Sequence, residues 1–230
     1  MKPILQAMHL EKIYGDPQSP TRVVALQNAS IALAPGEVVS IMGPSGSGKT
    51  TLISILGCIL KPTSGELLID GKAVTTLNET ALPEIRRRYI GFVFQAYNLF
   101  RSLNVQENVE LALQLKGIPD SQLSKQALEL LNLVGLSHRK SFAPADISGG
   151  EKQRVAIARA LAGDPPLILA DEPTANLDSR TGGEILSLFE LLARERKKSV
   201  VIVTHDPRIN KIQHRPIFIE DGRIQEVAHA

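Results

Sequence analysis

A glycine-rich stretch at positions 43–50 constrains the fold of this chain more than any other feature. It reads Gly-Pro-Ser-Gly-Ser-Gly-Lys-Thr, follows an apolar run, Val38–Met42, and precedes a helical pattern, Thr50–Leu60. Glycines let backbone N–H groups turn toward an anion, and the N-terminus of the next helix adds partial positive charge. The stretch therefore predicts a strand, a phosphate-binding loop and a helix within an α/β sheet protein.

Chance alone explains this stretch poorly. Its four fixed positions arise by accident in a chain of this size with odds of about one in a hundred. In such a loop Lys49 reaches the β- and γ-phosphates of a nucleotide, and Thr50 contacts Mg²⁺. We expect the following residues to bind the nucleotide: Gly43, Pro44, Ser45, Gly46, Ser47, Gly48, Lys49, Thr50 and Thr51.

Bulk properties narrow the class of protein. With 230 residues, 43% of them hydrophobic, the chain can form one full-sized core and a small appended subdomain. Its longest apolar stretch, Leu52–Leu60, is shorter than the roughly 20 residues of a membrane-spanning helix. A net charge of +2 is too small for a nucleic-acid binder. A single cysteine, Cys58, and no leader-like opening predict a cytoplasmic protein, with Cys58 packed in the core.

Short apolar runs alternate with longer helical patterns, which predicts a parallel sheet with crossover helices. Two such runs, Leu167–Ala170 and Val200–Thr204, end at the polar pairs Asp171-Glu172 and His205-Asp206. Ligands of open parallel sheets bind at the carboxyl ends of the strands. We therefore expect these pairs to meet the glycine-rich loop in one crevice.

Other segments extend this α/β core. Leu5–Ile13 and Val23–Leu33 read as antiparallel strands around an irregular loop, Gly15–Thr21. Helical spacing marks Val105–Leu115 and Ser124–Leu133. We expect one domain over residues 1–230, in which 1–95 and 155–230 form the core with its β subdomain and 96–154 form an inserted helical subdomain.

The two acids after the apolar run at 167–170 suit metal-assisted phosphate chemistry. Asp171 is placed to hold Mg²⁺, and Glu172 to polarise the attacking water. Alternation along a strand end points adjacent side chains in different directions, so the two can take separate roles. Alone, such a pair is more commonly a solvated turn, but beside a phosphate-binding loop the odds reverse.

Three further side chains are candidates for the same crevice. His205 is predicted to sense the γ-phosphate, or to hold the water and Glu172 by hydrogen bonds. Gln95 follows the strand-like Ile90–Phe94, where it can approach both Mg²⁺ and water and link the nucleotide to a partner. Tyr14 either stacks on adenine or packs in the core.

A second phosphate-binding segment, Ser148–Arg154, lies about a hundred residues after the first. One subunit is not expected to use both segments on one nucleotide, so the pair predicts a dimer that closes around ATP. The basic run Arg86–Arg88 reads either as a solvated helix face or as a docking surface for an acidic partner segment beside the Gln95 loop.

With these motifs in this order, the chain resembles the nucleotide-binding subunit of ABC transporters over almost its whole length. The resemblance implies a P-loop NTPase core of the RecA type, ATP and Mg²⁺ as cofactors, and a homodimer. It makes Tyr14 the adenine-stacking residue and Gln95 the Q-loop residue, which together with Thr50 and Asp171 contacts the metal. It makes Ser148, Gly149, Gly150 and Glu151 the signature that faces the other subunit's nucleotide, and Asp178 the D-loop acid at the dimer contact.

Within that family, Ile55–Cys58, Pro62–Gly65 and Ala170–Asp178 are similar to the group of MacB, LolD and DevA, with the stretches Phe94–Leu99 and Thr204–Ile209 nearest to DevA. This implies a subunit that powers export of a lipid, lipoprotein or drug across the cell envelope. The implied partners are a transmembrane permease, which attaches the subunit to the inner face of the plasma membrane, and a periplasmic adaptor.

Two rival functions stay open at this point: an importer ATPase, and an ATPase that signals across the envelope in cell division without transport. The chain also departs from the common signature at Ile147 and Glu151, and from the common D-loop at Ala175. Glu151 places an acid near the opposite nucleotide, where we expect one weaker ribose contact and retained activity.

Overall fold

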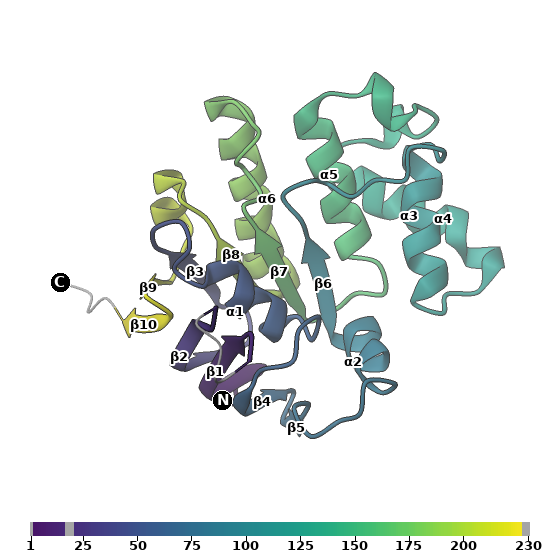
Figure 1. Ribbon diagram of the computed structural model, residues 1–230. Coiled ribbons are helices and arrows are strands. Elements are labelled where there is room, and N and C mark those ends of the chain that lie inside the picture. The colour runs from purple at the N-terminus through teal and green to yellow at the C-terminus, as the bar shows by residue number, and fades with distance from the viewer. Residues whose placement is uncertain (1, 17–20, 227–230) are drawn as a thin grey trace.

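The computed structural model describes residues 2–16 and 21–226, which form two sheets with helices around them (Figure 1). The central sheet has six strands in the order β10-β9-β3-β8-β7-β6, parallel except for β10 at one edge. Its strands are β3 (Val38–Met42), β6 (Ile90–Val93), β7 (Leu167–Asp171), β8 (Ser199–Val203), β9 (Arg215–Glu220) and β10 (Arg223–Glu226). The predicted α/β fold is confirmed.

A smaller antiparallel sheet, in the order β2-β1-β4-β5, packs beside the first. Its strands are β1 (Leu5–Tyr14), β2 (Val23–Leu33), β4 (Ser64–Ile69) and β5 (Lys72–Ala73). The predicted pairing of the first two is confirmed, with Leu5 opposite Leu33 and Tyr14 opposite Val23. Positions 17–20 of the predicted loop, Gly15–Thr21, lie outside the described residues.

The helices are α1 (Lys49–Leu56), α2 (Leu82–Tyr89), α3 (Val105–Leu115), α4 (Asp120–Leu133), α5 (Gly149–Ala160) and α6 (Ser179–Arg196), with short 3-10 turns η1 (Ser137–Arg139), η2 (Pro144–Asp146) and η3 (Pro207–Lys211). Figure 1 shows α3, α4 and α5 gathered on the β6 side of the sheet, away from β1 and β2. Within residues 2–16 and 21–226, no helix combines the length and apolarity needed to cross a bilayer.

The inner strands are buried on both faces, which explains their unbroken apolar runs. Ile168, Ala170, Val200 and Ile202 pack in one cluster with α3, α5 and α6. Their neighbours in sequence, Leu167, Leu169, Val201 and Val203, pack in a second cluster with α1, β1 and β2. Since side chains alternate along a strand, each apolar run supplies both clusters at once.

Three expectations about helix ends can be compared with the structure. The helix at Val105–Leu115 is confirmed, whereas the next begins at Asp120, directly after Pro119, rather than at Ser124. The prediction of a helix to Leu60 is wrong, because α1 ends at Leu56. There Gly57 caps the helix, Cys58 has φ 54°, and the N–H groups of residues 59 and 60 both donate to the carbonyl of Ser54.

The buried thiol of Cys58 belongs to the second cluster, as predicted. Burial raises its pKa to about 11, with Arg86 opposing the shift. The thiol is therefore protonated near neutral pH.

One close approach of backbone to backbone tests this packing. A Cβ at Gly91 in β6 would lie 2.1 Å from the carbonyl oxygen of Ala160 in α5. We expect Gly91→Ala to lower the free energy of unfolding by roughly 1–3 kcal/mol, because β6 and α5 must separate. Gly183→Ala in α6 is the matched control, since nothing lies within 4 Å of its added methyl group.

Urea unfolding of both variants measures the effect. The control should equal or exceed the wild type, as alanine is favoured over glycine inside a helix by about 1 kcal/mol. Equal stability of the two variants would show that β6 and α5 do not pack this tightly.

Candidate functional site

The glycine-rich loop joins β3 to α1 in a conformation that other residues cannot adopt. Gly43 and Gly48 have φ 154° and 104°. A Cβ on them would lie 2.0 Å from the carbonyl oxygen of Ile219 and 2.4 Å from that of Ala25. The loop is thus pressed against β9 and β2, and α1 begins directly after it at Lys49.

Lys49 folds back over this loop. Its Nζ donates to the carbonyl oxygens of Gly43 at 2.8 Å and Pro44 at 2.7 Å. Carbonyl oxygens bear only partial negative charge, so their hydrogen bonds with the ammonium group are weaker than those of a phosphate would be. The side chain of Ser47, a residue of the same loop, is buried, and its Oγ has no hydrogen-bond partner.

A cleft of about 570 Å³ opens beside the loop. It is lined by most of the loop, by Thr50 and Thr51 of α1, and by Gln95, Glu172 and His205 from the ends of β6, β7 and β8. The crevice expected from the carboxyl ends of the strands therefore exists. Segments from five parts of the chain meet in it, including the start of β2.

The cleft also has a wall that sequence reasoning missed, formed by Val23, Val24 and Ala25 of β2. Val23 is 56% exposed and Val24 38% exposed, which is unusual for adjacent valines at the start of a strand. The adjacent pair could have indicated this wall from the sequence. In a strand with one solvated face, apolar and polar residues alternate, and two adjacent valines break that alternation.

Tyr14 lies opposite Val23 in the sheet but is not among the residues that line the cleft. Its side chain is 41% exposed, so core packing, one of the two predicted roles, is wrong. The ammonium group of Lys12 lies 5.2 Å from the centre of its ring. Part of the ring surface is therefore accessible for another contact.

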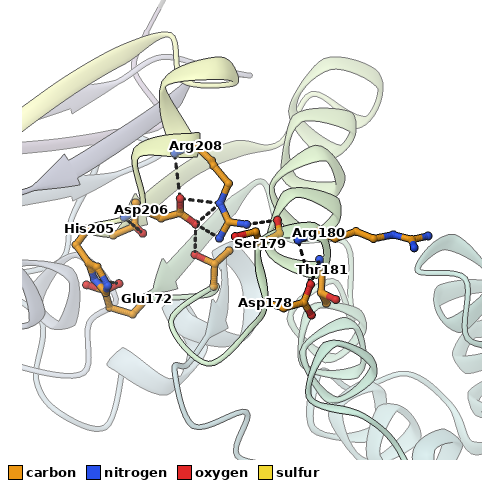
Figure 2. Close-up of polar contacts among 10 residues, drawn as sticks. Glu172, Asp178, Ser179, Arg180, Thr181, His205, Asp206 and Arg208 are labelled. Atoms are coloured by element: carbon orange, nitrogen blue, oxygen red, sulfur yellow. Dashed lines mark hydrogen bonds and ion pairs between the residues drawn. The ribbon is translucent and has the colours of Figure 1, made fainter.

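The side chains of Glu172 and His205, which both line the cleft, lie close to each other (Figure 2). Nδ1 of His205 lies 2.9 Å from Oε2 of Glu172, close enough for an ion pair, but without the alignment of a hydrogen bond. Glu172 has φ 47°, and its N–H donates to the carbonyl of Val203 at 2.8 Å. A left-handed backbone is rare for glutamate, so neighbouring strands hold this carboxylate in place.

Asp171 precedes Glu172 but lies behind the cleft lining, partly buried at the end of β7. Its Oδ1 has no hydrogen-bond partner. Burial raises the pKa of Asp171, the carboxylate of Glu172 raises it further, and Lys49 opposes both. A divalent cation would satisfy this oxygen and lower that pKa, so the residue fits a metal ligand.

Asp206, which was expected in the crevice beside His205, does not line the cleft. It is buried and pairs with the partly buried Arg208, in a network that sequence reasoning did not predict (Figure 2). Arg208 donates to both carboxylate oxygens of Asp206, and the hydroxyl of Thr174 donates to Oδ2 at 2.8 Å. These bonds, those from Arg208 foremost, hold the pKa of Asp206 at about 2. Arg208 also donates to the carbonyl of Ser179. The segment after His205 is thereby tied to the segment after Glu172.

The second phosphate-binding segment begins α5, and its residues do not line the cleft. Ser148 is the N-cap: its Oγ accepts the N–H of Glu151, and the Glu151 carboxylate accepts the N–H of Ser148 at 2.8 Å. Arg139 donates to the other oxygen of Glu151, at 3.0 Å. These bonds lower the pKa of Glu151, the bond from the Ser148 backbone most. The acid that replaces glutamine is thus compensated within its own chain.

Asp178 likewise caps a helix, since its Oδ1 accepts the N–H groups of Arg180 and Thr181 at the start of α6. A hydrogen bond of the Thr181 side chain and then these backbone bonds lower the pKa of its carboxyl group. Of the predicted site residues, the loop, Gln95, Glu172 and His205 come together. Tyr14, Asp171, Asp178 and Ser148–Glu151 lie outside the cleft lining.

Comparison with known proteins gives relatives along the whole chain. An uncharacterized ABC transporter ATP-binding protein of Thermotoga maritima is 47% identical over 99% of this chain and 96% of its own length. The macrolide export ATP-binding/permease protein MacB of Salmonella typhimurium is 43% identical over 97% of this chain, which spans 34% of MacB.

A solved structure shares the fold. It is the dimeric post-hydrolysis state of the ATP-binding cassette MJ0796 bound to ADP and Pi, with a TM-score of 0.88 and 42% identity, covering 98% of this chain and 100% of that chain. The family model described as ABC transporter matches residues 26–175. The chain therefore belongs to the ABC transporter family, as an ATP-binding cassette that hydrolyses ATP.

Proposed function

We propose that this chain is the ATPase subunit of an envelope exporter and that it works as a homodimer closed by ATP. The observation that carries the proposal is the separation of two phosphate-binding segments. Lys49, Gln95, Glu172 and His205 share one cleft, while Ser148 and its helix N-terminus lie outside it. A second copy is needed to bring both segments to one nucleotide.

Within the cleft, the glycine-rich loop and Lys49 bind the phosphates, and Lys49 exchanges its carbonyl partners for phosphate oxygens. The exposed ring of Tyr14, beside Val23, stacks on adenine. Thr50, Gln95 and Asp171 would hold Mg²⁺, which supplies charge neutralisation at the β- and γ-phosphates. The orphaned Oδ1 of Asp171 supports this assignment.

Glu172 polarises a water molecule that attacks the γ-phosphorus, while the bond to the bridging oxygen breaks and ADP leaves. His205 holds Glu172 and the γ-phosphate in register, as its position 2.9 Å from the carboxylate supports. The left-handed backbone at Glu172 keeps the group aimed without loop movement.

In the dimer, Ser148, Gly149 and Gly150 of one copy present the N-terminus of α5 to the γ-phosphate of the other. Asp178, next to this interface, caps α6. The charge of the γ-phosphate holds the two copies together, and they separate once phosphate leaves after hydrolysis, since the MJ0796 cassette is still dimeric with ADP and Pi bound. The dimeric state of the MJ0796 cassette supports this arrangement.

We propose that residues 96–154 form a helical subdomain that moves when the dimer closes. This movement is transmitted to a transmembrane permease. Gln95 immediately precedes it and lines the cleft. Through the permease, the subunit lies at the cytoplasmic face of the membrane.

Replacing Glu172 by glutamine tests the catalytic role. We expect Glu172→Gln to lower turnover by roughly 10² to 10⁴-fold, because the amide cannot accept the proton of water. ATP affinity should stay unchanged, and size-exclusion chromatography with ATP should show a dimer. Undiminished turnover would remove Glu172 from this role.

Mixing two inactive variants tests whether the site is shared. Lys49→Ala disables the loop, and Ser148→Arg blocks the signature. In a mixed dimer, one site contains both defects and the other contains none. We expect the mixture to hydrolyse ATP faster than either variant alone, and activity no higher than theirs would mean that each site lies within one chain.

The similarity to MacB, whose name records macrolide export by an ATP-binding/permease protein, supports the exporter assignment and a lipid, lipoprotein or drug as substrate. Likeness to DevA, and the periplasmic adaptor that it implies, stay predictions. An importer ATPase is the second candidate, because it would use the same nucleotide site and differ in its membrane partner and in a soluble binding protein. A signalling ATPase without transport is the third.

Purification from native membranes in mild detergent, followed by mass spectrometry, separates these candidates. We expect a co-purifying subunit with few membrane spans and a large extracytoplasmic domain. A permease with many spans and a solute-binding protein would mean import. A set of partners without any membrane protein would contradict transport.

A further inference from the structure

One side chain of α5 is buried without the hydrogen bonds that a polar group needs. Gln153 has no exposed surface, and neither Oε1 nor Nε2 of its amide has a hydrogen-bond partner among the described residues. A buried polar group without a partner lowers the stability of a fold, whereas an apolar side chain of similar size does not. The stability of this conformation therefore gives no reason for a glutamine at this position.

The neighbours of Gln153 on the helix show where its side chain points. α5 packs against α3, α6 and β6 (Figure 1), and residues three or four positions apart share one face of a helix. A Cβ on Gly149, one turn earlier, would lie 3.2 Å from the hydroxyl of Tyr97 and 3.5 Å from Cδ2 of Leu177. Ala156, three positions later, lines a pocket together with Tyr97. Gln153, between them, therefore points toward the segments that carry Tyr97 and Leu177.

Both of these segments adjoin the nucleotide cleft. Tyr97 belongs to the loop that carries Gln95, which lines the cleft. The other segment connects β7 to α6 and includes Asn176. One long hydrogen bond joins the two, from Nδ2 of Asn176 to the carbonyl oxygen of Gln95 at 3.4 Å. The buried amide of Gln153 thus faces the place where they meet.

The loop after Gln95 has a conformation that is costly on its own. Tyr97 and Asn98 have φ 60° and 51°, in the left-handed region that residues other than glycine seldom adopt. The N–H of Asn98 donates to the carbonyl of Ala96 at 2.6 Å, and a turn closed across one residue with positive φ is the strained form.

The hydroxyl of Tyr97 is available to a new partner. It makes no hydrogen bond within the part of the chain that the structure describes. Burial raises the pKa of Tyr97, so the hydroxyl stays protonated and can donate. A strained loop with a free donor can therefore change its conformation at little cost and pair with the amide of Gln153.

We propose that Gln153 is a positioning residue for ATP hydrolysis: when nucleotide fills the cleft, its amide hydrogen-bonds to the loop that carries Gln95 and holds Gln95 beside the attacking water. Oε1 accepts the hydroxyl of Tyr97, and Nε2 donates to a carbonyl oxygen of the same loop. The inference rests on the role proposed above for Gln95. It accounts for the buried amide, because the bonds that it lacks without nucleotide form when Gln95 is drawn inward.

Thermal unfolding without nucleotide tests whether the amide is unpaired in that state. Methionine is similar to glutamine in length and has no group that needs a hydrogen bond. We therefore expect Gln153→Met to have a melting temperature equal to or above that of the wild type, and Gln153→Leu to behave alike. A loss of stability in both variants would show that the amide is already paired, and would overturn the inference.

Steady-state kinetics test the role in the reaction. We expect Gln153→Met to lower kcat by roughly 10- to 100-fold, with a change in KM for ATP of less than about threefold, because Gln95 is no longer held in position. A residue that only fills space would not separate kcat from KM in a variant of undiminished stability. Gln114→Met, the same change at an exposed position of α3, is the matched control and should hydrolyse ATP like the wild type.

A double-mutant cycle with Gln95→Ala tests whether Gln153 acts through Gln95. If it does, adding Gln153→Met to Gln95→Ala should lower kcat by less than about threefold. A full multiplicative loss, or wild-type turnover in Gln153→Met alone, would overturn the inference while the proposed function stands. If Gln95→Ala alone turns over like the wild type, the proposed role of Gln95 is wrong, and this inference falls with it.

Discussion

Everything at the nucleotide cleft depends on a parallel sheet that is buried on both faces. Strands β3, β7 and β8 contribute alternate side chains to two hydrophobic clusters, one with α3, α5 and α6 and the other with α1, β1 and β2. At about 25 cal/mol per Å² of apolar surface, such double burial is the main stabilising contribution in a domain of this kind. It fixes the positions of the carboxyl ends of the strands. Glu172 and His205 come directly after β7 and β8 in the sequence, or within two residues of them, so their positions are fixed as well.

The rigidity of this frame allows the site to contain conformations that are costly on their own. Glu172 has a left-handed backbone, Gly43 and Gly48 touch neighbouring carbonyl groups, and Asp171 has an unsatisfied carboxylate oxygen. Each would relax in a loose loop. Here the adjoining strands hold them, so these groups are positioned before any ligand arrives.

Much of this arrangement was predictable from sequence, for identifiable reasons. The glycine-rich loop and the apolar runs before Asp171 and His205 are local patterns, and the rule that strand ends converge brings them together. The network of Asp206, Arg208 and Thr174 was not predictable, because Thr174 lies 32 positions before Asp206 and the three form no periodic pattern. The partner of Glu151 was not predictable either, because Arg139, which donates to its carboxylate, belongs to a separate turn. The end of α1 was missed because Cys58 gives no sign of a left-handed turn.

The bonds of Arg208 have one more consequence. It joins Asp206, next to His205, to the carbonyl of Ser179 at the start of α6, which Asp178 caps. A shift of that helix end therefore pulls on the histidine beside Glu172 through a short chain of charged hydrogen bonds. The first turn of α6 and the segment that carries His205 are therefore mechanically coupled, although they lie more than twenty positions apart in the sequence.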